Sequence, residues 1–411
     1  MTGAAQTAAS DTSRRRPKDR KQSIVDAAAG LFAERGFAAV GIDEIGAAVG
    51  VTGPAIYRHY PSKQDVLAAV LTTTADLVYD AIASAASSSE GQLVAAVEAA
   101  VRVSVEHPEY IATYLRERPR LTGEAANAAS RRERQSGRLW RQVIQTRWPQ
   151  LDRDRSAMRQ QAVIGGLTAA VLGRREVPEP RFVELLSASA LAVMRTGPQP
   201  ERSAAAAAAA AADGPGAGAG RWKPKGTRRE AILRTALELF AAHGYAGVGI
   251  DELGEAVGIS GSGIYRHYTS KTQILIDAFD VAGQRVAVGV DDALRLAASA
   301  SDALVRLSMS YATVALDSVA LITVTEREGD AIPPDERPRL ARRRRDVRDG
   351  WRVVVRESRP ELAEPEVRLL VRTVFPLVNQ AARAIEDRPE LLDELAALAR
   401  AHIVGVAVTD P

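Results

Sequence analysis

Apolar residues recur along the chain at the spacing of an α-helix. Ile24, Ala28, Leu31 and Phe32 stand at i, i+4, i+7 and i+8, which places their side chains on one face of a helix. Gly36 follows, and glycine commonly ends a helix because it adopts left-handed backbone angles without strain. Alternation of apolar and polar residues, the pattern of a half-buried strand, is not evident anywhere in the sequence. We therefore predict an all-α protein.

The first part of the chain recurs 208 residues later without a gap. More than half of the positions are identical between residues 20–63, RKQSIVDAAAGLFAERGFAAVGIDEIGAAVGVTGPAIYRHYPSK, and residues 228–271, RREAILRTALELFAAHGYAGVGIDELGEAVGISGSGIYRHYTSK. Similarity continues more faintly at an offset of 211, where Trp140 corresponds to Trp351 and Pro149 to Pro360. The repeat period is far too long for a solenoid, so the sequence indicates duplication of a whole domain.

Each copy predicts two short helices around a tight turn. Residues 42–49 and 250–257 form the supporting helix, and Gly50 and Gly258 stand where a left-handed residue must end it. Thr52 and Ser260 then suit the N-cap of the next helix. A helix, a glycine-containing turn and a second helix that reads DNA make up the helix-turn-helix motif.

The second helix of each motif reads GPAIYRHY in one copy and GSGIYRHY in the other. Small residues at its start allow the first turn to approach base edges closely. Ser62 and Ser270 are predicted to cap a long fourth helix, and Lys63 and Lys271 follow them. Free amides at a helix start beside a lysine are suited to bind phosphate.

The combined string, ending in Ile-Tyr-Arg-His-Tyr-x-Ser-Lys, resembles the signature of the TetR family of transcription regulators and occurs twice. The resemblance implies that Arg58 and Arg266 contact base edges and that Tyr60, Tyr268 and the two lysines contact phosphates. The alternative for the tyrosines and histidines is that they close the three-helix core. The residues predicted to bind DNA are Thr52, Gly53, Pro54, Tyr57, Arg58, His59, Tyr60, Lys63, Ser260, Gly261, Ser262, Tyr265, Arg266, His267, Tyr268 and Lys271.

The tandem arrangement departs from typical family members, which are single-repeat homodimers. It resembles the double-TetR regulators of lipid-uptake (mce) operons in actinomycetes. We predict a basic arm (1–18), a first DNA-binding domain (19–63), a first helical effector and dimerisation domain (64–196), an Ala/Gly/Pro linker (197–220), a basic arm with the second DNA-binding domain (221–271) and a second helical domain (272–411).

The resemblance also implies how the two copies pair. In the family the last two helices of each protomer form a four-helix interface, and here residues 157–173, 181–195, 364–386 and 389–408 correspond to them. A flexible linker of this length spans about 27 Å, so pairing within one chain is feasible. We predict a monomeric pseudo-dimer on an imperfect palindrome, and a dimer of tandem chains is the alternative.

Charge is distributed as two DNA-facing modules require. Residues 1–63 hold nine Lys and Arg against six Asp and Glu, and residues 221–271 hold eight against five, while the whole chain has a net charge of only +3. Basic arms, Arg14–Lys21 and Arg221–Lys225, precede both motifs. They are either solvated tails or arms that reach phosphates and the minor groove.

The helical domains carry little evident chemistry. The resemblance implies an internal pocket for a small effector, which we expect to be hydrophobic and of lipid or acyl type, and which releases a repressor from DNA. Tyr114, Trp140, Tyr311 and Trp351 are the candidate pocket residues, although such side chains are more often plain core.

Other classes of protein receive less support. The chain has no cysteine, and its five histidines have no metal-binding spacing, so we predict no enzyme activity, cofactor or metal site. Without a long uncharged apolar run or an apolar leader, we expect no membrane partner and a cytoplasmic, nucleoid-associated protein. The main alternative is an architectural DNA-binding protein without sequence specificity or effector.

Overall fold

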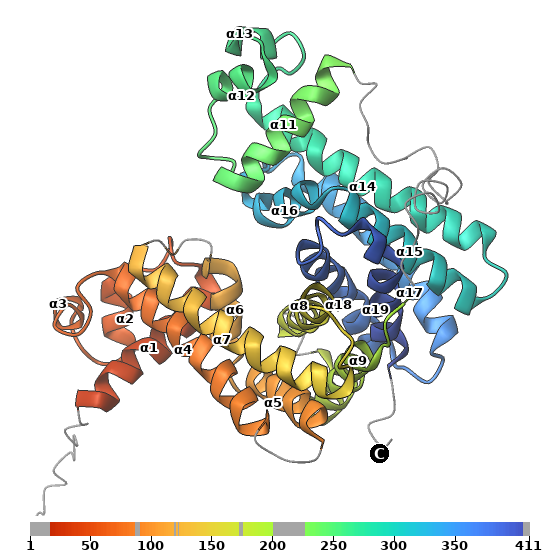
Figure 1. Ribbon diagram of the computed structural model, residues 1–411. Helices are drawn as coiled ribbons and strands as arrows, with labels where there is room; N and C mark the ends of the chain where they lie inside the picture. Colours follow the sequence, from red (N-terminus) through yellow and green to blue (C-terminus); the bar gives the residue numbers. More distant parts are fainter. Residues whose placement is uncertain are drawn as a thin grey trace, which may run out of the picture. The chain divides into compact units, whose positions relative to one another are not determined.

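The computed structural model describes residues 17–86, 91–118, 121, 123–171, 176–199 and 227–405 (Figure 1). Regular structure in these ranges is entirely helical, which confirms the predicted all-α class. We refer to the described residues up to 199 as the first copy and to those from 227 as the second copy. The predicted basic arms, except Pro17–Lys21, and all of the linker beyond Gln199 lie outside the described residues.

The helices of the two copies follow one another in the same order. In the first copy they are α1 (Pro17–Arg35), α2 (Ile42–Ala48), α3 (Gly53–Ile56), α4 (Lys63–Ala86), α5 (Gln92–Glu106), α6 (Pro108–Glu117), α7 (Gly123–Arg147), α8 (Arg153–Val171) and α9 (Glu179–Arg195). In the second copy they are α11 (Arg228–His243), α12 (Ile250–Val257), α13 (Gly261–Ile264), α14 (Lys271–Leu296), α15 (Ala300–Asp317), α16 (Val319–Arg327), η4 (Gly329–Ala331), α17 (Arg337–Ser358), α18 (Glu364–Arg383), η5 (Pro389–Leu391) and α19 (Leu392–Val404).

Side-chain caps fix where the long fourth helix of each copy begins. The hydroxyl of Ser62 accepts a hydrogen bond from the amide of Asp65 at 3.2 Å, and that of Ser270 accepts one from the amide of Gln273 at 3.1 Å. Both predicted caps are confirmed. They satisfy amides that the first turn of a helix otherwise leaves without a partner.

The chain divides into two compact units that cut across the predicted domains. The described residues of Met1–Asp80 and Glu106–Gln135 form one unit, and those of Ala81–Val105 and Ser136–Pro411 form the other. The first unit therefore contains the first helix-turn-helix together with α6 and the start of α7. The second unit contains α8 and α9 of the first copy and the whole described second copy.

The core of the first unit forms around α1 and α4. Ile24, Ala28 and Phe32 of α1 are fully buried, as the spacing of apolar residues predicted. By length and composition α4 could cross a membrane, with a mean hydropathy of 1.5, and the bent pair of α15 and α16 passes the same test together. Val66 and Leu67 of α4 are fully buried in this protein core, however, and a core helix meets the same criteria.

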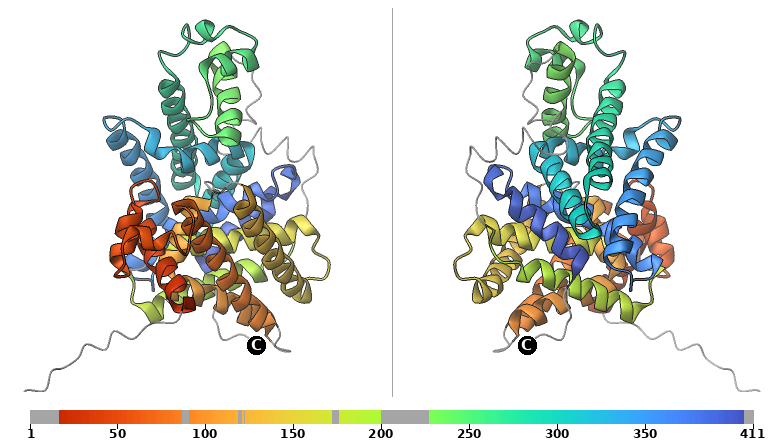
Figure 2. Two further views of the ribbon diagram at one scale, coloured as in Figure 1. Left: turned by 90° about the vertical axis from the view of Figure 1, so that its left-hand side faces the viewer. Right: turned by 90° about the vertical axis from the view of Figure 1, so that its right-hand side faces the viewer.

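In the second unit, four helices from the two copies pack together. Helix α8 lies along α18, and α9 lies along α19, as the views in Figures 1 and 2 show. These four helices occupy the segments expected to form a four-helix interface. The second helix-turn-helix stands at one end of the long helix α14 in both views of Figure 2.

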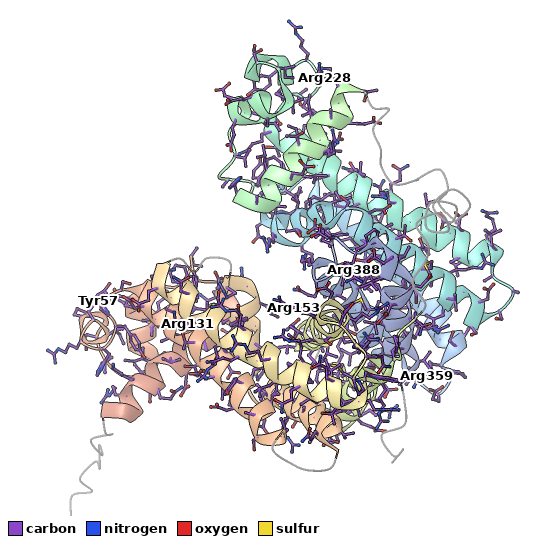
Figure 3. The ribbon with its side chains drawn as sticks, viewed as in Figure 1. Tyr57, Arg131, Arg153, Arg228, Arg359 and Arg388 are labelled. Carbon is purple, nitrogen blue, oxygen red and sulfur yellow. The ribbon has the colours of Figure 1, made fainter. Side chains whose placement is uncertain are left out.

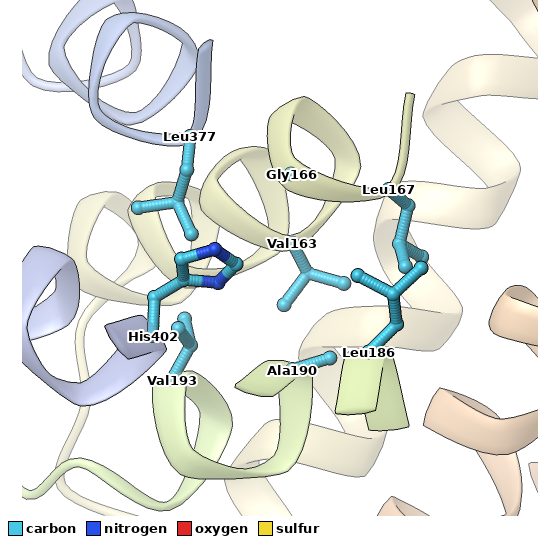
Figure 4. Close-up of a pocket in the computed structure, with 8 residues that line it drawn as sticks. All are labelled: Val163, Gly166, Leu167, Leu186, Ala190, Val193, Leu377 and His402. Atoms are coloured by element: carbon cyan, nitrogen blue, oxygen red, sulfur yellow. The ribbon is translucent and has the colours of Figure 1, made fainter. Parts of the chain in front are cut away.

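A small cavity lies among these four helices (Figure 4). Its volume is about 10 Å³, which is room for roughly one water molecule and none for an organic effector. His402 of α19 lines it, with Nε2 2.7 Å from the hydroxyl of Thr373. Burial lowers the pKa of His402 to about 4, so the ring is neutral at neutral pH. The other lining residues are Val163, Gly166, Leu167, Leu186, Ala190, Val193 and Leu377.

Candidate nucleic-acid interface

The two helix-turn-helix motifs share one backbone geometry. Gly50 and Gly258 have φ angles of +70° and +75°, which are the left-handed conformation that glycine adopts without a Cβ clash. The chain then reverses, and the amides of Val51 and Ile259 both donate 2.9 Å hydrogen bonds to carbonyls of the supporting helices. The predicted turn is therefore confirmed in both copies.

Close contact between the two helices of each motif depends on glycines that sequence analysis did not single out. A Cβ on Gly46 of α2 would lie 2.8 Å from the carbonyl oxygen of Val51, and one on Gly254 of α12 would lie 2.8 Å from the amide of Gly261. Real Cβ atoms do not approach backbone atoms so closely. The signal was present in the sequence, because both glycines stand inside a helix where glycine is unfavourable.

Gly53 and Gly261 lie inside the motif rather than on its surface. Both are buried, and a Cβ on either would overlap a carboxylate of the supporting helix, that of Asp43 or Asp251. Both glycines are among the residues predicted to bind DNA. Their position shows that they let the reading helix approach the supporting helix, and they have no side chain to offer a base.

Most of the other predicted contacts are on the surface. Tyr57 is 50% exposed and Tyr265 is 56% exposed, although large aromatic side chains are usually buried. Tyr57 lies on the outer part of the first motif in Figure 3. The remaining exposed members of the predicted set are Thr52, Pro54, Arg58, Ser260, Ser262 and Arg266.

The histidines and the last tyrosine of the motif are less accessible. His59, His267 and Tyr60 are half-buried, whereas Tyr268 is 2% exposed and its hydroxyl donates to the carbonyl of Arg229 at 3.3 Å. Burial raises the pKa of both Tyr60 and Tyr268, so both phenols keep their protons. For Tyr268 the structure therefore agrees with the alternative in which this tyrosine closes the core.

A cation from the first helix of each copy covers this tyrosine ring. The ammonium of Lys21 lies 5.9 Å from the ring centre of Tyr60, and the guanidinium of Arg229 lies 4.1 Å from that of Tyr268. Lys21 and Arg229 are equivalent at the offset of 208. The shorter approach in the second copy is consistent with the deeper position of Tyr268.

Lys63 and Lys271 are engaged with the protein itself. The ammonium of Lys63 donates to the carbonyls of Phe37 and Val40, both at 2.9 Å. That of Lys271 donates to the equivalent carbonyls of Tyr245 and Val248, both at 2.8 Å. An ammonium has three N–H donors, so the predicted phosphate contact of each lysine would use its third donor. Both lysines tie the start of the fourth helix to the loop before the supporting helix.

The candidate pocket residues of the helical domains are packed against protein groups. Trp351 is fully buried and stacks edge-on with Tyr311 and Phe375, whose ring centres lie 6.5 and 5.4 Å away. Trp140 is 2% exposed. The hydroxyl of Tyr114 donates to Glu133, which also pairs with Arg118. These environments are those of core residues, and the position of an effector pocket stays a prediction.

No group of three or more His, Asp or Glu side chains that could hold a metal ion occurs in the described part of the chain. The predicted arms Arg14–Arg16 and Arg221–Lys225 lie outside the described residues. The described surface of the motifs includes a Tyr-Arg pair, small polar residues and helix starts, along with exposed carboxylates of α2 and α12. Such a surface is suited to hydrogen bonding with nucleic-acid edges and phosphates.

Comparison with known proteins finds a family match in two segments of the chain. Residues 24–70 and 232–278 each match the bacterial regulatory proteins of the tetR family. These are the two helix-turn-helix regions and the first turns of the helices that follow them. In these two segments the chain is similar to the bacterial regulatory proteins of the tetR family.

Individual relatives cover only part of the chain. The HTH-type transcriptional activator FasR of Mycolicibacterium smegmatis is 36% identical over 89 residues, which are 21% of this chain and 41% of the relative. The chain thus matches about two fifths of the length of this curated relative. Among solved structures, the TetR family regulator PfmR from Thermus thermophilus is 24% identical, with 42% of this chain and 96% of that chain covered and a TM-score of 0.39. A TetR-family regulator from Bordetella parapertussis is 20% identical, with 40% and 93% covered and a TM-score of 0.36.

Proposed function

We propose that the chain binds double-stranded DNA at one operator made of two related, non-identical half-sites. The observation that carries this proposal is the repeated reading surface. Both motifs expose a Tyr-Arg pair, Tyr57 with Arg58 and Tyr265 with Arg266, on the same backbone frame. Arginine to guanine is the commonest specific contact in the major groove, so two such surfaces favour sequence readout.

The half-sites differ in this proposal because the two reading turns differ. Exposed Pro54 of the first copy stands where the second copy has exposed Ser262, and Ala55 stands where it has Gly263. A serine hydroxyl can donate and accept a hydrogen bond, whereas proline presents only an apolar ring. The operator is therefore an imperfect palindrome.

One chain serves as a pseudo-dimer on this operator. The packing of α8 and α9 against α18 and α19 supports pairing within one chain, because these helices hold the interface positions that the family uses between protomers. A dimer of tandem chains, with four reading motifs, is the alternative mode.

Regulation follows the family pattern in this proposal. A small hydrophobic ligand of lipid or acyl type binds a helical domain, and it releases a repressor by binding the DNA-free state more tightly. The tandem organisation suggests control of lipid-uptake (mce) genes, with the protein acting in the cytoplasm at the nucleoid. The FasR relative is named as an activator. A reporter assay of the target genes with and without this protein therefore tests the proposed repression against activation.

A footprint on the DNA upstream of the protein's own gene, at physiological salt, tests the operator. We expect one protected site with two imperfectly related halves, saturated by one chain. Protection by two chains would favour the dimer of tandem chains. Equal binding to DNA of any sequence, with the same salt dependence, would contradict the proposal and support the architectural alternative.

A further inference from the structure

Helices α8 and α18 meet at equivalent positions of the repeat. At the offset of 211, Gly165 of α8 corresponds to Pro376 of α18. These two residues touch each other, because a Cβ on Gly165 would overlap the carbonyl oxygen of Pro376. Contact between equivalent residues is what a twofold axis produces. Helices α8 and α18 are therefore related by a pseudo-twofold axis that passes near this contact.

A buried ion pair joins α8 of the first copy to α19 of the second. The carboxylate of Glu394 lies 2.9 Å from Arg155 and 2.5 Å from Arg159. The side chains of Glu394 and Arg159 are 1% and 0% exposed. Arg159 also donates to the carbonyl of Thr196 at 2.9 Å. A carboxylate this deeply buried requires a positive partner, because the charge otherwise loses its hydration without compensation.

On the other side of the axis, the charges are exchanged between the copies. Glu366 of α18 is the equivalent of Arg155, and it pairs with Arg181 of α9. The first copy thus presents an arginine from α8 to an acid of the second copy. The second copy presents an acid from α18 to an arginine of the first.

Two outer clusters are also charged in a copy-specific way. In the first cluster, Glu176 of the first copy pairs with Arg368 and Arg372 of α18, at 3.0 and 2.6 Å. The first-copy equivalents of these arginines are Ala157 and Gln161, which carry no charge. A pair of first copies would therefore leave Glu176 facing uncharged residues.

The second outer cluster has the same property. Arg388 of the second copy pairs with Asp152 and Asp154 of the first, at 3.5 and 2.8 Å. The second-copy equivalents of these aspartates are Ala363 and Pro365. A pair of second copies would therefore lose both of these ion pairs.

We infer that the two halves of the chain are built to pair with each other and not with a second copy of themselves. In a pair of first copies, symmetry would bring Arg155 of one against Arg181 of the other. In a pair of second copies, it would bring Glu366 against Glu394, both in nearly buried positions. Like charges held close together repel, most strongly for the two nearly buried glutamates and less for Arg181, whose side chain is 37% exposed. A like pair, made of two first copies or of two second copies, is therefore disfavoured at two symmetric places.

This inference rests on the pseudo-dimer of the proposed function and adds a rule for partner choice. It predicts that a half freed from its own chain accepts only the opposite half. Tandem chains would then exchange halves only as first-with-second pairs, even at high concentration.

The test starts from the full chain with a protease site in place of Ala204–Ala212. The folded protein is cut, unfolded in urea and refolded, and the complexes are weighed by native mass spectrometry. We expect the mixed pair, one first copy with one second copy, to be at least about tenfold more abundant than either like pair. Halves that separate on cutting would overturn the pseudo-dimer itself. Like pairs at statistical abundance would overturn the selectivity alone.

A double variant of the same cleavable chain, Arg181→Glu with Glu366→Arg, isolates the charge rule. The mixed pair keeps its complementarity with the signs exchanged. Like pairs become complementary as well. In a pair of first copies Arg155 would face the acid introduced at position 181, and in a pair of second copies Glu394 would face the arginine introduced at position 366. We expect like pairs to rise toward statistical abundance, and an unchanged excess of the mixed pair would contradict the inference.

Two features keep this comparison interpretable. Glu366 also accepts a 2.6 Å hydrogen bond from the amide of Ala363, and its loss weakens only the second copy, so the abundance of first-copy pairs is the cleaner measure. The matched control exchanges the ion pair of Asp292 and Arg295, which lies within α14, by Asp292→Arg with Arg295→Asp. This control should retain the excess of the mixed pair.

Discussion

The two helix-turn-helix motifs have the same backbone geometry and differ in the side chains that they expose. Both have a left-handed glycine at the turn, a helix glycine pressed against the backbone, and a lysine bound to two carbonyls. In the first domain the N-cap Thr52 makes no side-chain cap bond. In the second, Ser260 accepts from the amide of Gly263 and also lies 2.9 Å from the hydroxyl of Ser262.

The comparison distinguishes residues that the fold requires from residues that can change without disturbing the fold. The close-contact glycines Gly46 and Gly53 are glycines in the second copy as well, since a Cβ there would overlap neighbouring atoms. Among the exposed positions, Tyr57 and Arg58 are unchanged in the second copy, whereas Pro54 corresponds to Ser262.

Replacing the helix glycine by alanine should have the largest effect. In Gly46→Ala the new Cβ meets backbone atoms of the turn, so we expect a loss of about 3 kcal/mol in the stability of that domain. Protection of one half-site should disappear in a footprint, and Gly254→Ala should remove the other. Gly30→Ala is the control, because nothing lies within 4 Å of its new Cβ. Unchanged thermal unfolding of Gly46→Ala would refute the close contact.

Removing the lysine ammonium should come next. Lys63→Met and Lys271→Met each lose two hydrogen bonds to carbonyls, and we expect a loss of about 2 kcal/mol in unfolding free energy without DNA. Thermal unfolding of the free protein measures it, with Lys21→Met as the control on the same domain. If the main role of Lys63 is a phosphate contact, stability will instead be unchanged and the salt slope of binding will fall by about one.

The parts of the site that follow from local rules could be predicted from the sequence. Helix caps at Ser62 and Ser270 and the left-handed Gly50 and Gly258 depend on neighbouring residues alone, and the structure confirms them. The inward turn of Lys63 could not be foreseen, since a lysine after a helix cap can face either phosphate or protein.

The same limit applies to contacts that depend on how helices meet. Tyr268 is buried and Tyr60 only half-buried although their local sequences are almost identical, so neighbouring packing decides their exposure. Glu394 and Arg159 are 235 residues apart in the chain, and no spacing rule connects them. Sequence located the four interface helices but not the charges that they bring together.

Truncating the exposed arginines should have a smaller effect that is confined to one half-site each. Arg58→Ala should weaken binding by about 1 to 2 kcal/mol, or roughly 5- to 30-fold, because a single contact to a base edge is lost. Arg266→Ala should do the same at the other half-site. Binding measured on operators with one half-site scrambled separates the two. A loss that is equal on every DNA sequence would mean that these arginines contact phosphates only.

Exchanging the differing surface should have the smallest effect on affinity and the clearest effect on preference. Pro54→Ser with Ala55→Gly gives the first reading turn the residues of the second, and no backbone contact of the frame is changed. We expect affinity for the natural operator to fall by less than about tenfold, within about 1.4 kcal/mol, since the Tyr-Arg pair remains. In a binding-site selection the preferred sequence should become symmetric, with both halves like the one that the second domain reads. The reverse exchange, Ser262→Pro with Gly263→Ala, should produce the opposite symmetric site. Selection of the natural, asymmetric operator by both variants would show that the half-sites are distinguished elsewhere, and the basic arms that precede the motifs would be the next segments to exchange.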